Sequence, residues 1–257
     1  MKNNIKKISE KIKFLIKDKY AGKWHPEFLN DLKRLKAGEP LDYIIGWKPF
    51  LNCQIDLSQK PFIPRPETEY WTEKFIAFAK TRGSRLKILD AFAGSGCIGI
   101  AILKNLKNTN VNFIEKNPEF IKQIKINLKL NKIASSRYQI IHSNIFENIG
   151  INKKYNFILA NPPYVPLKNK KIISVSVLKY EPLSAIFGKK DGLFYIKKFL
   201  KQTKNRLKSN GEIWLEFDSL QKNAVKKLVQ KEKYQLCEFE RDQYGRWRYA
   251  KIKNLFA

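Results

Sequence analysis

The tetrapeptide Asn161-Pro162-Pro163-Tyr164 directly follows Phe157–Ala160, an apolar run typical of a buried strand. Two consecutive prolines give a rigid backbone with no N–H to donate, so the Asn161 side-chain oxygen and the Pro162 carbonyl remain as oriented acceptors. The Tyr164 ring offers a face on which a planar group can stack. These groups could hold both protons of a planar NH₂ group with its nitrogen lone pair facing an electrophile. An ordinary proline-rich turn is the alternative, but α/β sheets bind ligands at the carboxyl ends of their strands, which favours a site.

A glycine-rich segment, Ala91-Phe92-Ala93-Gly94-Ser95-Gly96, joins an apolar run that ends at Asp90 to the start of an expected helix. Such a turn lets the backbone come close to a bound ligand. Glu115 ends the next apolar run, about 20 residues further on, where an acidic side chain can accept hydrogen bonds from both ribose hydroxyls. The two features predict an adenosine-containing cofactor, without distinguishing a nicotinamide dinucleotide from S-adenosylmethionine.

From residue 85 onward, apolar runs of strand length alternate with stretches of helical periodicity. We expect helices at 97–107, 118–130, 191–208 and 219–231. Apolar strands between helices indicate an α/β, Rossmann-like fold with a mostly parallel, seven-stranded sheet, whose last two strands form an antiparallel edge hairpin. The expected strands are Leu86–Asp90, Val111–Glu115, Tyr138–His142, Phe157–Ala160, Glu212–Phe217, Tyr234–Glu240 and Trp247–Ile252.

The chain before the main domain divides into two expected segments. Residues 1–37 are predicted to be helical, because Ile5, Ile8 and Ile12 recur at helical spacing between lysines. A basic amphipathic helix could lie on a membrane, but a small helical cap over the main domain is favoured. Residues 38–69 are predicted to form a β-hairpin linker, with β-prone runs at 43–45 and 53–57. Residues 70–257 then make up the main domain.

Composition sets outer limits on these interpretations. The chain has 257 residues, 43% of them hydrophobic, enough for a domain of about 200 residues and a small appendage. No stretch is apolar enough to span a membrane, and the Lys-rich start lacks the apolar core of a secretion signal. The three cysteines, Cys53, Cys97 and Cys237, are scattered. We therefore expect no disulfide framework, no metal site and a cytoplasmic protein.

The balance of charge is strongly basic. Lys and Arg number 51 against 23 Asp and Glu, which gives a formal net charge of +28. Such charge attracts anionic partners, nucleic acid among them. However, the 51 basic residues are 42 Lys and 9 Arg, spread over the whole chain, as an AT-rich genome would encode. We favour codon bias as the main source, and charge alone does not name a partner.

Several motifs together resemble a known family. Asn161-Pro162-Pro163-Tyr164 matches the signature of S-adenosylmethionine-dependent methyltransferases that act on planar nitrogens, namely adenine N6, guanine N2 or glutamine amides. The segments 38–46 and 63–69 resemble the two signatures of the peptide chain release factor N5-glutamine methyltransferases, and later motifs at 180–182, 191–193 and 241–246 follow in the right order. The resemblance covers residue 38 to the end. Sister enzymes that methylate a ribosomal protein usually carry Pro-Arg-Ser where this chain has Pro64-Arg65-Pro66.

The resemblance implies a class I methyltransferase fold and assigns roles by position. The cofactor S-adenosylmethionine would lie over Phe92, Ala93, Gly94, Ser95 and Gly96, with Glu115 on the ribose, Asn144 and Ile145 at the adenine, and Asn161 nearby. Asn161, Pro162, Pro163 and Tyr164 would bind the substrate glutamine of a Gly-Gly-Gln motif, with Asn161, Pro162 and Tyr164 as catalytic residues. Arg65, Glu67 and Thr68 would lie close to them.

The implied reaction is methyl transfer to a carboxamide nitrogen in a release factor, which supports translation termination. That nitrogen is a poor nucleophile because its lone pair is delocalised into the carbonyl. Orientation against a sulfonium methyl group can supply several kcal/mol of catalysis without a strong base. Neither a metal nor a histidine is required, and we interpret His25 and His142 as structural.

Three departures from the family pattern lead to expectations of their own. Phe92 stands where Gly is usual, which implies a φ angle below zero there and a reshaped cofactor loop. Asn144 stands where Asp is common and keeps only an amide oxygen for the adenine. The helical region before Gly38 is shorter than the usual amino-terminal domain, which bears on substrate affinity.

Two other functions remain open at this point. A nucleic-acid methyltransferase would use the same Asn161 site with Tyr164 stacked on a flipped base, and Lys168, Lys170 and Lys171 could bind its phosphates. The Pro64–Glu69 segment and the lack of a separate target-recognition domain argue against it. A binding protein with a decayed site is the non-enzymatic alternative, and it rests on the altered Phe92 loop.

Overall fold

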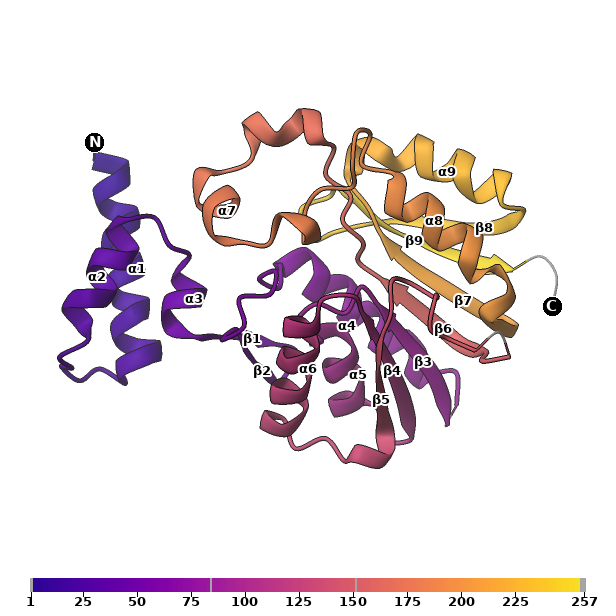
Figure 1. Cartoon of the computed structure of the whole chain (residues 1–257), viewed down its shortest axis with the longest axis horizontal. Helices are drawn as coiled ribbons and strands as arrows, with labels where there is room; N and C mark the ends of the chain where they lie inside the picture. Colours follow the sequence, from indigo (N-terminus) through magenta and orange to yellow (C-terminus); the bar gives the residue numbers. More distant parts are fainter. Residues whose placement is uncertain (1, 84, 151, 255–257) are drawn as a thin grey trace.

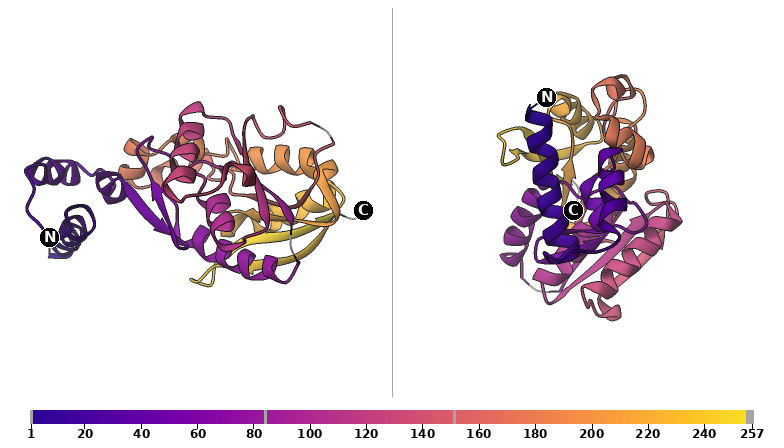
Figure 2. Two further views of the ribbon diagram at one scale, coloured as in Figure 1. Left: turned by 90° about the horizontal axis from the view of Figure 1, so that it is seen from below. Right: turned by 90° about the vertical axis from the view of Figure 1, so that its left-hand side faces the viewer.

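The computed structural model describes residues 2–83, 85–150 and 152–254. A seven-stranded sheet forms its centre, with an N-terminal group of helices at one end of the molecule (Figures 1 and 2). The side chain of Cys237 lies outside the described residues, whereas Cys53 and Cys97 are buried free thiols. No helix in the described part of the chain is long and apolar enough to cross a bilayer.

The sheet has the strand order β5-β4-β3-β6-β7-β9-β8. Its first five members are parallel, and β9 runs antiparallel to both β7 and β8, as the sequence predicted. The seven predicted strands are all present; half of their ends are as predicted, and the others differ by one to five residues. The observed strands are β3 (Leu86–Ala91), β4 (Thr109–Glu115), β5 (Tyr138–His142), β6 (Tyr155–Ala160), β7 (Leu207–Glu216), β8 (Tyr234–Arg241) and β9 (Trp247–Asn254).

Helices cover both faces of this sheet (Figure 1). The helices α4 (Pro66–Lys80), α5 (Cys97–Asn105) and α6 (Pro118–Leu130) pack on the face that carries Ile88 and Trp214. The helices α8 (Phe194–Thr203) and α9 (Lys222–Lys231) pack on the opposite face, which carries Leu89 and Ile213. Neighbouring residues of one strand point to opposite faces, so apolar residues at consecutive positions are what a sheet covered on both sides needs.

Helix α4 was not predicted from the sequence, although its start has ordinary helix signals. Pro66 occupies the first turn together with Glu67 and Glu69, whose charges favour a helix N-terminus. Its buried face places Trp71 and Phe75 over the sheet, where the Phe75 ring meets Trp214 edge to face with centroids 5.2 Å apart. The helix α7 (Val175–Tyr180) was also missed.

The linker contains a hairpin of β1 (Trp47–Phe50) and β2 (Cys53–Asp56), but the predicted β-prone run at 43–45 is wrong. Those residues lie in a short helix, α3 (Leu41–Ile45), that ends at Gly46 with φ +94°. A three-residue apolar run carries too little periodicity to separate strand from helix. The hairpin docks on α6 through Asn127, whose side chain bonds both the N–H and the carbonyl of Asp56.

The helices α1 (Lys2–Tyr20) and α2 (Phe28–Lys36) have a small core of their own with α3, built from Leu15, Tyr20, Leu35 and Ile44. They project from one end of the molecule and do not cover the main domain as the sequence analysis expected (Figure 2). The small core explains this, because these apolar side chains are buried against one another and not against the main domain. Tyr180 and Ser176 of α7 donate to the carbonyls of Ala37 and Gly38, which ties this region to the main domain.

Candidate active site

A cavity of about 690 Å³ lies at the carboxyl ends of β3, β4, β6 and β7. Open α/β sheets bind ligands at this edge, where the strand order reverses. Its lining includes all the residues that the sequence singled out for the cofactor or the glutamine substrate, with the exception of Gly96. These are Arg65, Glu67, Thr68, Phe92, Ala93, Gly94, Ser95, Glu115, Asn144, Ile145, Asn161, Pro162, Pro163 and Tyr164.

The glycine-rich turn between β3 and α5 forms one wall, and each glycine has its own reason. Gly94 has φ +55°, and a Cβ there would meet nothing closer than 3.9 Å, so this position faces open space. Gly96 caps α5 with φ +79° and lies against Ile100 and Ile124, which is why it does not line the cavity. A Cβ on Gly99 would overlap the Phe113 ring, so only glycine lets α5 pack this closely on β4.

Asp90, near the end of β3, connects the strand to the first turn of α5. It is fully buried and accepts a hydrogen bond from the Gly99 N–H at 2.9 Å through Oδ2, while Oδ1 has no partner among the described residues. Burial, with the nearby Glu115 carboxylate, raises the pKa of Asp90 to about 8. The side chain is therefore largely protonated at neutral pH and stabilises the loop as a neutral group.

Phe92 corrects an expectation from the sequence, because its φ angle is +60° and not below zero. The backbone keeps the conformation that glycine usually supplies, and the large side chain adapts to it. The ring packs against Tyr195 and Phe199 of α8, with centroids 6.2 and 5.9 Å away. A non-glycine residue in this region costs about 1–3 kcal/mol, and the aromatic contacts offset part of that strain.

Glu115 is held rigidly at the end of β4. One carboxylate oxygen accepts from the Gly94 N–H at 2.8 Å, and the other accepts from the N–H groups of Lys116 and Asn117, each at 2.8 Å. The residue is 9% exposed and lines the cavity, and burial raises its pKa despite these three bonds. Three of the four lone-pair positions of the carboxylate are used in this way, and the fourth, on the oxygen that bonds Gly94, is available to a ligand such as a ribose diol.

Asn144 and Ile145 follow β5 and form the next part of the wall. Ile145 is buried with φ +59°, a strained conformation for a β-branched residue that is typical of functional sites. The Asn144 Nδ2 group donates to Glu147 at 2.7 Å, so its amide oxygen is left as the acceptor. An apolar side chain beside an oriented acceptor fits the face and the amino group of an adenine ring.

The segment Asn161-Pro162-Pro163-Tyr164 leaves the end of β6 as the sequence predicted. The Asn161 Nδ2 group donates to Thr68 Oγ1 of α4 at 3.1 Å, which puts the amide oxygen on the other arm of the side chain. The Tyr164 hydroxyl donates to Glu216 Oε1 at 2.9 Å, and its ring lines the cavity. Two glycines, Gly188 and Gly192, pack so tightly on the carbonyls of Pro163 and Tyr164 that neither could carry a Cβ.

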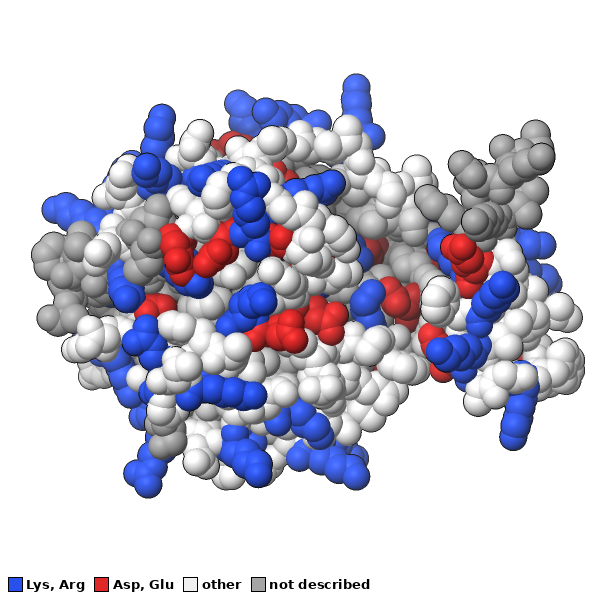
Figure 3. All heavy atoms as spheres, turned by 180° about the vertical axis from the view of Figure 1, so that it is seen from behind, with Lys and Arg blue, Asp and Glu red and all other residues white. Residues whose placement is uncertain are grey.

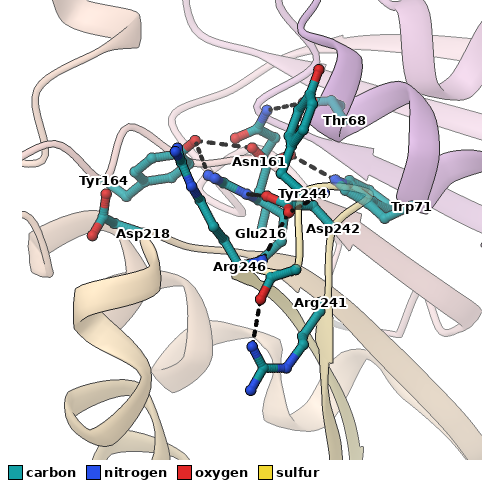
Figure 4. A network of polar contacts seen from close by, with 12 residues as sticks. Thr68, Trp71, Asn161, Tyr164, Glu216, Asp218, Arg241, Asp242, Tyr244 and Arg246 are labelled. Carbon is teal, nitrogen blue, oxygen red and sulfur yellow. Dashed lines mark hydrogen bonds and ion pairs between the residues drawn. The ribbon is translucent and has the colours of Figure 1, made fainter.

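A buried carboxylate beneath this segment was missed by the sequence analysis. Glu216 is 1% exposed and accepts hydrogen bonds from Thr68 Oγ1 at 2.8 Å, Trp71 Nε1 at 2.6 Å and the Tyr164 hydroxyl (Figure 4). Burial raises the pKa of Glu216, and its hydrogen bonds and the nearby Arg248 guanidinium oppose that rise. One signal was available, because an acidic residue interrupts the otherwise apolar run 213–217 on the strand next to β6.

Arg248 connects this carboxylate to the turn between β8 and β9. Its Nε donates to Asp242 Oδ2 at 3.1 Å, and its Nη1 lies 3.4 Å from the Tyr164 hydroxyl oxygen. Asp242 Oδ1 also accepts from the N–H groups of Tyr244 and Arg246. The motif at 241–246 therefore builds the turn that holds Arg248 in place.

The motif at 63–69 and the motif at 180–182 bind each other at the mouth of the cavity. Arg65 forms an ion pair with the buried Glu181 at 2.6 Å, and its guanidinium lies over the Phe62 ring at 4.4 Å. Glu181 also accepts from the Ile63 N–H at 3.1 Å. Glu67 lines the same mouth.

Basic side chains spread over the molecular face shown in Figure 3 and do not gather into one stripe. Lys168, Lys170 and Lys171 are exposed beyond the cavity. Within the described residues, no group of three His, Cys, Asp or Glu side chains could hold a metal ion. The His142 Nε2–H donates to the Lys116 carbonyl at 2.8 Å, and His25 stacks on Tyr20, which are structural contacts.

Comparison with solved structures places the fold among methyltransferases. A ribosomal protein L11 methylase from Lactobacillus delbrueckii subsp. bulgaricus aligns with a TM-score of 0.56 at 17% identity, over 77% of this chain and 82% of that one. The hMettl16 catalytic domain aligns with a TM-score of 0.60 at 16% identity, over 80% of this chain and 77% of that one. At such identities the likeness concerns the fold alone.

Sequence comparison is more specific. Residues 72–179 match the Methyltransferase small domain family. Release factor glutamine methyltransferases from Flavobacterium psychrophilum and Lactococcus lactis are each 32% identical over 86% of this chain, and the matches span 78% and 80% of those proteins. A bifunctional methyltransferase from Rickettsia prowazekii is 35% identical over 82% of this chain, which corresponds to 44% of that longer protein. The chain belongs to the release factor glutamine methyltransferase family.

Proposed function

We propose that this protein transfers a methyl group from S-adenosylmethionine to the side-chain amide nitrogen of the glutamine in the Gly-Gly-Gln motif of a peptide chain release factor. The observation that carries the proposal is that one cavity joins Glu115 and the glycine turn to Asn161-Pro162-Pro163-Tyr164. A site for an adenosine cofactor and a site for a planar NH₂ group thus lie side by side in one cavity. Since the substrate acts on the ribosome, the activity belongs to the cytoplasm.

The residues on the β3–β5 side would hold the cofactor. Glu115 accepts from the ribose hydroxyls, Asn144 and Ile145 receive the adenine, and the Phe92–Ser95 backbone lies along the rest of the molecule, with Gly96 shaping the turn from behind. When bound, the cofactor supplies a methyl group made electrophilic by its sulfonium centre. The fit rests on the fixed Glu115 carboxylate and on the open space in front of Gly94.

The residues on the β6 side would orient the glutamine. The Asn161 amide oxygen and the Pro162 carbonyl each accept a hydrogen bond from one N–H of the substrate NH₂, so that its lone pair faces the methyl group. The Tyr164 ring forms the adjoining wall, and Pro163 keeps the backbone rigid. Holding the reactants in this geometry lets the nitrogen form the bond to the methyl group, as its bond to the sulfonium breaks, without prior removal of a proton by a base. The methylated nitrogen then releases one proton to water and becomes the neutral N-methyl amide. Arg65 and Glu67 at the mouth would contact the substrate backbone.

The N-terminal helices would provide a second grip on the release factor. We propose a helical substrate-binding region at 1–37, a linker at 38–69 and a catalytic domain at 70–257. Apolar side chains are exposed on the helical region, with Trp24 76% and Leu29 63% exposed. These side chains are accessible to a partner, and burying them against a release factor would add apolar contact to the grip.

The proposal is tested by tritiated methyl transfer from S-adenosylmethionine to three acceptors in parallel: a purified release factor, total RNA and DNA. We expect label in the release factor alone. A release factor whose Gly-Gly-Gln glutamine is replaced by alanine is the matched control and should take up no label. Label in RNA or DNA, with none in the release factor, would instead establish the nucleic-acid alternative.

A further inference from the structure

A chain of hydrogen bonds runs from the buried Glu216 through Thr68 to Asn161 (Figure 4). Thr68 Oγ1 lies 2.8 Å from Glu216 Oε2 and 3.1 Å from Asn161 Nδ2. Thr68 is 2% exposed and belongs to α4, whereas Asn161 follows β6 and Glu216 ends β7. The register pairs Ala160 with Leu215, so Asn161 and Glu216 are the next residues along two neighbouring strands.

The direction of each bond in this chain is determined by the chemistry of the groups. An ionised carboxylate only accepts, and a threonine hydroxyl has one proton to give. When Thr68 donates that proton to Glu216, its oxygen can only accept from Asn161. The NH₂ arm of the Asn161 amide must then face Thr68, and the oxygen arm must face away from it.

The other groups that bond Glu216 also donate to it, which favours the ionised carboxylate. Trp71 Nε1 can only donate, and it lies 2.6 Å from the same oxygen that Thr68 contacts. The Tyr164 hydroxyl donates to the second oxygen, and Arg248 lies beside that hydroxyl with its positive charge. A buried carboxylate with three donors and a nearby guanidinium meets the conditions under which a buried charge is tolerated.

We propose that Glu216 is a positioning residue that, through Thr68, sets the Asn161 side chain with its amide oxygen toward the acceptor NH₂ of the substrate. This rests on the proposed glutamine methyltransferase function. If the amide turned over, Asn161 would present its own NH₂ to the substrate NH₂, and two donors would face each other. Glu216 thus determines whether the Asn161 side chain can accept a hydrogen bond from the substrate NH₂, without touching the substrate itself.

A purely structural role for Glu216 and Thr68 makes a different prediction. Both residues also hold α4 on the sheet, so their loss could act through stability alone. Thr72 provides a matched control, because it lies one turn further along α4, is fully buried, and donates its hydroxyl to the Thr68 carbonyl. A structural role would make Thr68→Val and Thr72→Val alike in activity when each is folded.

The experiment measures four quantities on the full-length wild type, Thr68→Val, Thr68→Ser and Thr72→Val. These are the melting temperature, the affinity for S-adenosylhomocysteine, and kcat and KM for a release factor. Thr68→Val should lower kcat about 10- to 100-fold, the range seen when a group that orients a functional ligand is removed. Its cofactor affinity should stay within about twofold of wild type, since Glu115 is untouched. Thr68→Ser should recover most of the wild-type kcat. Thr72→Val should retain the wild-type kcat although its melting temperature falls by about as much as that of Thr68→Val.

A second readout does not depend on the substrate. The side-chain NH₂ resonances of Asn161, assigned by their loss in Asn161→Asp, should shift in Thr68→Val and in Glu216→Gln but not in Thr72→Val. A folded Thr68→Val protein with wild-type kcat, or with unshifted Asn161 resonances, would overturn the inference. If the wild type methylates no release factor but the resonances shift as described, the proposed function fails while the orientation of Asn161 stands.

Discussion

The two halves of the cavity are built in different ways. The half proposed to hold the cofactor, called the cofactor half, uses backbone N–H groups and residues at positive φ in the short turns that follow β3, β4 and β5. The half proposed to hold the glutamine, called the substrate half, uses side chains that come from distant parts of the chain, since Thr68 and Glu216 are 148 residues apart. A turn is specified by local sequence, whereas a side-chain network exists only when the whole sheet has formed. The comparison predicts that the two halves can be damaged separately.

The largest effect is expected from Asn161→Ala. The substitution removes the acceptor for one amide proton, so the substrate NH₂ can rotate and its lone pair is misaimed. Loss of one preorganised hydrogen bond of this kind lowers the rate about 10²–10³-fold. We expect single-turnover methylation to fall by at least that factor, with affinity for S-adenosylhomocysteine nearly unchanged. Calorimetry on the same preparation measures the affinity for S-adenosylhomocysteine. A loss of that affinity together with the methylation rate would contradict the prediction.

The reciprocal variant is Glu115→Ala. It removes a carboxylate that would bond the ribose, and hydrogen bonds to charged groups are worth about 1.5–3 kcal/mol each. Cofactor affinity should therefore fall by roughly 10- to 150-fold, the equivalent of that free energy. Turnover at saturating cofactor should fall much less than in Asn161→Ala. Because Glu115 also accepts three backbone N–H groups, the melting temperature is measured alongside.

Asp90 provides a test of how the cofactor half is supported. Its pKa is raised from an ordinary value of 3.8 to about 8 by burial, so the folded state binds a proton that the unfolded state releases. The resulting stability is fully present below pH 3.8 and is lost as pH rises toward 8. The slope attributable to Asp90 reaches about 1.4 kcal/mol per pH unit at most.

Denaturant titrations at several pH values compare the wild type with Asp90→Asn. Glu115 and Glu216 also have raised pKa values, so they too lower the free energy of unfolding as the pH rises. Only the difference between the wild type and Asp90→Asn therefore reports on Asp90. The free energy of unfolding should decline less steeply with pH in Asp90→Asn. Parallel pH curves for the two proteins would show that Asp90 is ionised in the folded state.

The smallest expected effect separates strain from packing at Phe92. Phe92→Ala removes the ring contacts with Tyr195 and Phe199 but keeps a Cβ at positive φ, whereas Phe92→Gly removes both. The free energy of unfolding of Phe92→Gly should therefore exceed that of Phe92→Ala by about 1 kcal/mol. The difference in the free energy of unfolding between the two variants measures the backbone strain. Equal stability would mean that this turn relaxes when the ring is lost.

The sequence alone predicted much of the cofactor half, because its signals are local. The seven strands, the glycine turn and Glu115 were all visible as short patterns of apolar residues, glycine and charge. The φ angle of Phe92 was not predictable from its neighbours, since the packing that offsets its strain comes from Tyr195 and Phe199 on α8. Local steric rules favour a negative φ for phenylalanine, and tertiary contacts reversed that preference.

In the substrate half, the sequence predicted Asn161-Pro162-Pro163-Tyr164 but not what holds it. In the sequence, Glu216 is a single charged residue near the end of a predicted strand. Its neighbours in the sequence do not indicate that three hydrogen-bond donors surround it. Helix α4, which brings Thr68 and Trp71 to it, was missed because the prolines at 61, 64 and 66 suggested a linker. Proline at the first turn of a helix is favourable, so the third of them marked a start and not an interruption.

The most direct test of the account locates the methyl group. The release factor is incubated with S-adenosylmethionine and the wild type or Asn161→Ala, and its peptides are sequenced by tandem mass spectrometry. The account predicts one methyl group on the side-chain nitrogen of the Gly-Gly-Gln glutamine with the wild type, and at least a 10²-fold lower yield at the same time point with Asn161→Ala. A methyl group on a different residue, or a yield with Asn161→Ala above about a tenth of the wild-type value, would contradict it.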